Sequence, residues 1–155
     1  MNEALERLAR EVRLDDPSNE RMRLEFGCAC VLRVKHFLEE PEVVACLGAL
    51  ADFLGGSLDR SRFDAAAQEA VRLANQHQGS KSIDGCGHSA VSASYAVANA
   101  LSGKALQAAE YAAYAIVYGQ GGYGAVGDRA SFEPEFQWQV SCLASLVEKG
   151  VPPPT

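Results

Sequence analysis

The amino-acid sequence predicts an all-α protein, a single compact bundle of six to seven helices with a central alanine-rich helical hairpin. Alternating runs of β-branched residues, which strands need, do not occur in it. Good helix formers dominate, and alanine is very frequent from Ala45 onward. The chain has 155 residues, of which 48% are hydrophobic, so we expect one packed domain over residues 1–150.

An acidic break separates the first two predicted helices. Residues 2–14 form the first helix, because apolar side chains three and four positions apart share one face. Residues 15–18 end it, and Ser18 or Asn19 can cap a second helix that runs to about Leu38.

Proline and glycine mark the limits of the third helix. Pro41 suits the first turn of a helix, and Gly55 follows its end. A fourth helix begins at Asp59 or Ser61, both of which are good capping residues. The polar residues 76–82 then predict a loop.

Two alanine-rich segments predict the central hairpin. They cover residues 85–101 and 104–118, with Gly103 between them. Small side chains allow two helices to approach closely, and we expect aromatic side chains to fill the remaining gaps. These are Tyr95, Tyr111, Tyr114 and Tyr118.

A glycine-rich segment precedes the last helix. Residues 119–131 contain five glycines without periodicity, which predicts a flexible loop. Its first six residues match the letters of the dinucleotide-binding fingerprint, but that motif requires a preceding strand and an immediately following helix. Ser131 caps a final helix that ends at Gly150, and residues 151–155 form an extended, proline-rich tail.

The charge balance narrows the classes of partner. The formal net charge is -6, from 20 acidic and 14 basic residues. Such a surface repels nucleic-acid phosphates and anionic lipids, so we expect neither a nucleic-acid partner nor a membrane partner. A basic protein is compatible with it, although a mildly acidic surface also serves solubility alone.

Cysteine usage and the first residues predict a cytoplasmic protein with reduced thiols. The number of cysteines, five, is odd, and no apolar run approaches the roughly 20 residues that span a bilayer. Residues 1–13 are charged throughout, which is not typical of a signal peptide.

No residue pattern assigns a catalytic group, a metal or another cofactor. Cys28 and Cys30 point about 200° apart on a helix and cannot chelate one ion together. A zinc site of His77, Cys86 and His88 has no recognised ligand spacing. Ordinary structural roles are the better interpretation of these side chains.

Acidic residues near the glycine-rich segment form a candidate contact surface. Asp128, Glu133 and Glu135 could meet lysines or arginines of a partner, and Tyr123 is an aromatic anchor of the kind enriched at hot spots. The alternative is that Glu133 and Glu135 only stabilise the N-terminus of the last helix through its dipole.

Two stretches of the hairpin carry a family resemblance. Residues 87–95 (GHSAVSASY) and 103–115 (GKALQAAEYAAYA) resemble the all-helical immunity proteins of bacterial polymorphic toxin systems. Members carry a small-residue helix opening with Gly-His or Gly-Gln, then an Ala-Leu-x-Ala-Ala-x-Tyr-Ala helix. The resemblance covers roughly residues 26–118. Relatives often have histidines late in the first of these helices, where this chain has Tyr95 and Asn99.

The resemblance implies an immunity protein that is not an enzyme and that neutralises a cognate toxin domain by occlusion. His88 and Tyr111 are the positions that match the family pattern. The acidic surface would suit a basic toxin. Two alternatives stay open: a helical bundle that binds a small ligand or metal, or acts as an enzyme through His88 and Cys86, and an oligomerisation module.

Overall fold

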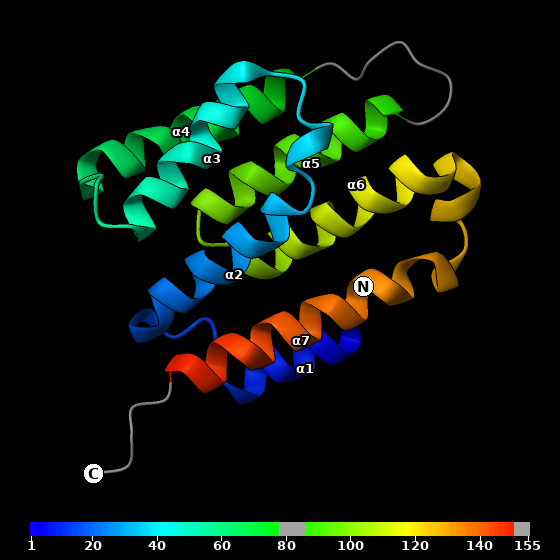
Figure 1. Cartoon of the computed structure of the whole chain (residues 1–155), viewed down its shortest axis with the longest axis horizontal. Coiled ribbons are helices and arrows are strands. Elements are labelled where there is room, and N and C mark those ends of the chain that lie inside the picture. Colours follow the sequence, from blue (N-terminus) through cyan, green and yellow to red (C-terminus); the bar gives the residue numbers. More distant parts are fainter. Residues whose placement is uncertain (78–85, 151–155) are drawn as a thin grey trace.

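Helices make up nearly all of the regular structure. The computed structural model describes residues 1–77 and 86–150, and in these ranges it contains seven α-helices and no β-strand (Figure 1). The predicted all-α class is therefore confirmed; the predicted tail, residues 151–155, lies outside the described residues. The helices are α1 (Glu3–Glu11), α2 (Glu20–Leu32), α3 (Pro41–Leu54), α4 (Arg60–Gln76), α5 (Cys86–Leu101), α6 (Ala105–Val126) and α7 (Glu133–Gly150).

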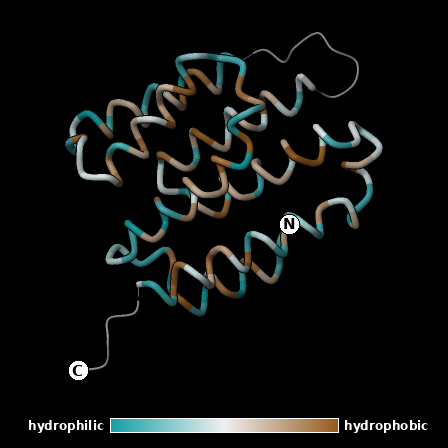
Figure 2. The backbone as a smooth tube through the Cα atoms, viewed as in Figure 1, coloured by the Kyte–Doolittle hydropathy of each residue, from teal (hydrophilic) through white to brown (hydrophobic). Residues whose placement is uncertain are grey.

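The α5–α6 hairpin lies at the centre of the bundle. Helices α3 and α4 form a pair that covers α5, while α1 and α7 lie together on the opposite side of the molecule (Figure 1). Helix α2 contacts α3, α5, α6 and α7, so it joins the two outer pairs to the hairpin. Hydrophobic and hydrophilic segments alternate along the helices (Figure 2). Their buried apolar side chains form one large core cluster and a second, smaller one of Ala113, Val117 and Phe132. No helix among the described residues is long and apolar enough to cross a membrane.

Several helix boundaries follow from local sequence. Asp59 caps α4, because its carboxylate accepts a hydrogen bond from the backbone N–H of Arg62 at 2.8 Å. Pro41 occupies the first turn of α3, as predicted. Asn2 caps α1 in the same way, by accepting from the N–H of Leu5 at 3.2 Å.

The second helix is shorter than predicted. It ends at Leu32 instead of near Leu38, and a 3-10 turn, η2 (Lys35–Phe37), follows. Val34 leaves the helical region of the backbone, and its side chain is fully buried. Tertiary packing of Val34 thus overrides the local helical pattern.

The predicted alanine-rich hairpin is confirmed. Gly103 adopts a positive φ of 76° in the turn, and Ala108, Ala109 and Ala112 are at most 1% exposed. The expected role of the tyrosines is confirmed in part: Tyr95 and Tyr114 pack against the core, whereas Tyr111 is 38% exposed and stacks on Tyr95.

The predicted glycine-rich loop is also wrong. Helix α6 continues through this segment to Val126, with a kink at Gly122, where φ is 63°. A short 3-10 turn, η3 (Arg129–Phe132), then leads into α7 at Glu133. Glycine permits the kink because it has no Cβ to clash at positive φ.

Close contact within the hairpin makes enlargement of its alanines unfavourable. We expect Ala109→Leu and Ala112→Leu each to lower the free energy of unfolding by about 1–3 kcal/mol, because the added atoms force packed helices apart. Urea denaturation measures this, with Ala45→Leu on an exposed position of α3 as the control. Wild-type midpoints for both buried variants would contradict the contact.

Candidate protein-binding surface

Three aromatic side chains meet where α5 begins and α6 bends. The ring of His88 stacks on Tyr118, with 5.1 Å between centroids, and meets the ring of Tyr123 edge-on at 5.0 Å. Tyr118 and Tyr123 are nearly perpendicular at 5.9 Å. His88 is exposed and Tyr123 is 56% exposed, so this end of the cluster faces solvent.

Further rings continue this cluster towards α7. Tyr114 lies 6.3 Å from Tyr118 and 5.1 Å from Phe132, and Phe132 lies 5.5 Å from Phe136. Phe132 is only 8% exposed, so the series is anchored in the protein at this end. We call the whole series the aromatic ridge: His88, Tyr123, Tyr118, Tyr114, Phe132 and Phe136.

Phe37 of η2 approaches the backbone of α6 closely at Gly119, the residue that follows Tyr118 of the ridge. A Cβ on Gly119 would lie 2.5 Å from ring atoms of Phe37, and 3.4 Å from the hydroxyl of buried Ser89. Gly119 therefore lets Phe37 pack directly on the backbone of α6. The kink three residues later, at Gly122, then carries Tyr123 to His88.

A groove runs beside the buried end of the ridge. Three openings of about 780, 240 and 170 Å³ share Met1 and Phe136 in their walls. They lie between the start of α1, the side of α6 and the start of α7. We call them together the N-terminal groove, and its charged side chains are Glu3, Glu6, Glu110, Arg129 and Glu133.

The three predicted acidic contacts have three different environments. Asp128 caps η3 by accepting from the N–H of Ala130 at 3.0 Å. Glu133 is exposed, lines the N-terminal groove and accepts a hydrogen bond from Gln137 at 3.2 Å. Glu135 is only 4% exposed. The prediction that Glu135 forms an acidic rim is therefore wrong.

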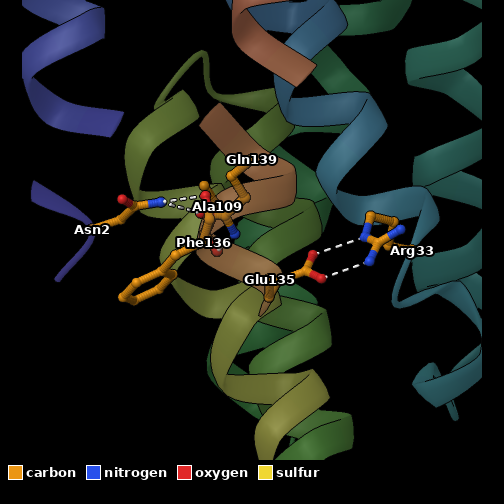
Figure 3. Close-up of polar contacts among 6 residues, drawn as sticks. All are labelled: Asn2, Arg33, Ala109, Glu135, Phe136 and Gln139. Atoms are coloured by element: carbon orange, nitrogen blue, oxygen red, sulfur yellow. Dashed lines mark hydrogen bonds and ion pairs between the residues drawn. The ribbon is translucent and has the colours of Figure 1, made fainter. Parts of the chain in front are cut away.

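Arg33 explains why Glu135 is buried. Its Nε and Nη2 atoms donate to the two carboxylate oxygens at 2.8 and 2.7 Å (Figure 3). The guanidinium also lies over the ring of Trp138, 4.0 Å from the centroid. The hydrogen bonds to Glu135 raise the pKa of Arg33 above its usual range. This pair joins α2 to α7.

A second polar network was not predicted from the sequence. Gln139 is fully buried and donates to the backbone oxygen of Ala109 at 2.8 Å. The amide of Asn2 donates to Gln139 at 3.2 Å and to the oxygen of Phe136 at 3.1 Å (Figure 3). Asn2 thus caps α1 and attaches it to α7. Only the position of Gln139 between the apolar residues Phe136 and Leu143 could have indicated this role.

The two predicted family positions are separate in their contacts. His88 belongs to the aromatic ridge, whereas Tyr111 stacks on Tyr95 at 5.3 Å. The structure brings His88 together with Tyr123, although the sequence singled them out for different reasons.

The described residues provide no metal cluster: no group of three or more His, Cys, Asp or Glu side chains could hold an ion there. His77 instead lies 3.0 Å from the hydroxyl of Ser94. Ser94 is completely buried, so this pair links α4 to α5 without presenting its hydroxyl to a substrate. The side chain of Cys86, named with His88 in the alternative hypothesis, lies outside the described part.

The four cysteines whose side chains are described are free thiols, as predicted for them. Burial raises the pKa of Cys28, Cys30, Cys46 and Cys142, and that of Cys30 most. Elevated pKa values disfavour the reactive thiolate. These thiols therefore have the character of core side chains.

The raised thiol pKa values predict a loss of stability in alkali. The folded chain holds these protons more tightly than the unfolded chain, whose thiols have a pKa of about 8.5. The stabilisation is therefore complete below about pH 8.5 and declines as the pH rises through that value. Urea unfolding at pH 7.5 and 9.5 should show this decline, and Cys30→Ala should make it smaller. An unchanged slope in that variant would contradict it.

Comparison with known proteins gives no relative from which a function could be transferred. No family model, curated protein or solved structure matches the chain.

Proposed function

We propose that this protein is an immunity protein that binds a cognate bacterial toxin domain and neutralises it by occlusion. The main support is the exposed end of the aromatic ridge, where Tyr123 is 56% exposed while it packs on His88 and Tyr118. The resemblance of residues 87–95 and 103–115 to all-helical immunity proteins supports the same proposal.

The geometry of the ridge suits a protein contact. Tyrosine supplies a large contact area with few rotatable bonds, and it is enriched among the residues that dominate binding energy. The neighbouring rings restrict Tyr123 before binding, which reduces the entropy lost on association. An exposed aromatic side chain that enters the active-site cleft of the toxin would keep the substrate out of it.

Charge supports the choice of partner. The net charge of -6 favours a basic toxin, because complementary fields accelerate association. The expected mode is then fast, salt-dependent encounter followed by burial of the ridge.

Co-purification with the product of the adjacent gene tests the proposal. The wild-type chain should form a stable complex, and Tyr123→Ala or His88→Ala should weaken it about tenfold to a hundredfold, as expected for a hot-spot residue. Val71→Ala is the control, because Val71 is also exposed, at 41%, but lies on α4.

The possible results distinguish a wrong contact surface from a wrong function. Unchanged affinity for both ridge variants would place the contact elsewhere on the chain. A specific loss in Tyr111→Ala would place it at the Tyr95–Tyr111 pair. Failure of the wild-type protein to bind any adjacent-gene product would remove the support for an immunity role.

A further inference from the structure

The last turns of α6 contribute no buried side chain to the core. Seven side chains of α6 from Ala105 to Val117 are buried, whereas none between Val117 and Phe132 is buried. In Figure 1 this end of α6 lies at the margin of the bundle, where the chain bends back towards α7. Segments with few buried apolar contacts open at a lower free-energy cost than the rest of a fold. This end of α6 can therefore open while the core stays folded.

Glycine weakens the helix in the same place. Residues 119–127 contain five glycines, and glycine lowers helical stability because it loses more conformational freedom on folding than any other residue. The helix is interrupted at Gly122, where φ is 63° and ψ is -149°. Residues with a Cβ rarely adopt a positive φ, so Gly122 is a point at which the chain can pivot.

Ring contacts hold this end of α6 against the bundle. Tyr123 packs on His88 of α5 and on Tyr118, with 5.0 and 5.9 Å between the ring centroids. Ala125 and Val126 are half-buried against the smaller core cluster. An aromatic pair adds only a modest stabilisation to a fold. The closed arrangement of these rings therefore has a small energetic advantage over an open one.

We propose that residues 123–127, which we call the hinged segment, open and close as a unit about Gly122, and that this movement breaks and remakes the exposed end of the aromatic ridge. The chain is anchored on both sides of the segment, by the contact of Phe37 with Gly119 and by buried Phe132. Opening lifts Tyr123 from His88 and leaves the rest of the hairpin in place. The inference goes beyond the proposed function, because it concerns the free chain and requires no partner.

Three glycine substitutions test the pivot by the sign of their effects. A Cβ on Gly124 would meet no atom within 4 Å, so Gly124→Ala favours the helical, closed form. Gly122→Ala disfavours that form, because alanine is strained at a positive φ. Gly48→Ala is the matched control: a Cβ on Gly48 also meets no atom within 4 Å, but this residue lies on α3.

Amide hydrogen exchange of the full chain, followed by NMR, measures the opening. The N–H of Gly127 donates to the oxygen of Tyr123 at 3.3 Å and is released when the segment opens. Its exchange should be about two- to fivefold slower in Gly124→Ala, about five- to thirtyfold faster in Gly122→Ala, and unchanged in Gly48→Ala. In the wild-type chain, low urea concentrations should accelerate exchange at Ala112 and not at Gly127, because local opening exposes little surface.

A second set of variants distinguishes concerted opening from simple fraying of the helix end. If Tyr123 and Gly127 open together, His88→Ala and Tyr123→Ala should each accelerate exchange at Gly127 by about two- to tenfold, the contribution of an aromatic pair. Val71→Ala, at an exposed position of α4, should leave this rate unchanged. If only the last residues fray, neither ring variant changes it. The proposal is overturned if Gly127 fails to respond to both ring variants, or if Gly122→Ala and Gly124→Ala act in the same direction.

Discussion

Truncation of Phe26 to alanine is expected to lower the free energy of unfolding by about 3–5 kcal/mol, the range for a fully buried phenylalanine. Phe26 is 0% exposed and lies on α2, which contacts α3, α5, α6 and α7. A cavity beside a helix that is packed on several sides closes only in part, because the surrounding helices hold one another in place. Equilibrium urea denaturation measures the loss.

Two comparisons check the origin of this loss. Phe26→Leu keeps most of the volume and should cost less than half as much. Leu32→Ala, on the same helix but 53% exposed, should cost less than about 0.5 kcal/mol. Equal losses at Phe26 and Leu32 would show that helix propensity, and not burial, explains the effect.

Replacement of Arg33 by alanine is expected to cost about 2–3 kcal/mol. The carboxylate of Glu135 is 4% exposed and would lose its only ion-pair partner among the described residues. Removing one partner of a fully buried pair costs about 3–5 kcal/mol. The expected cost is lower here because the side chain of Arg33 is 38% exposed, so that solvent screens the interaction. Loss of the guanidinium from the ring of Trp138 adds to the effect.

Arg21→Ala is the matched control for this variant. Arg21 lies on the same helix and pairs with Glu25 at 2.9 Å, but its side chain is 67% exposed. Its loss should cost no more than about 0.5 kcal/mol. Arg33→Ala with Glu135→Leu should recover part of the stability, because no buried charge is then left unpaired. A cost for Arg33→Ala no larger than that of the control would contradict the structural role of the pair.

These two predictions concern a helix whose importance the sequence did not indicate. The buried residues of α2 include Leu24, Phe26, Cys28, Cys30 and Val31, which do not share one narrow face. A helix that is apolar on several sides is typical of a buried position between other helices. Its position between two helix pairs and the hairpin follows from contacts that are distant in sequence.

Local sequence determined the existence of the helices and several of their ends. Asp59 caps α4, Pro41 starts α3, and Gly103 turns the chain between α5 and α6. Each of these effects depends on a side chain or backbone preference within one helical turn. The sequence therefore predicted the all-α class and the central hairpin correctly.

Only the tertiary structure decided the features that depend on distant contacts. Phe37 packs on Gly119, within a glycine-rich segment that local propensity reads as a loop. Arg33 and Glu135, 102 positions apart, turn a predicted surface carboxylate into a buried one. His88 and Tyr123 meet because Gly122 bends α6. Composition and spacing carry no information about such pairs, because packing and desolvation energies depend on which distant side chains become neighbours.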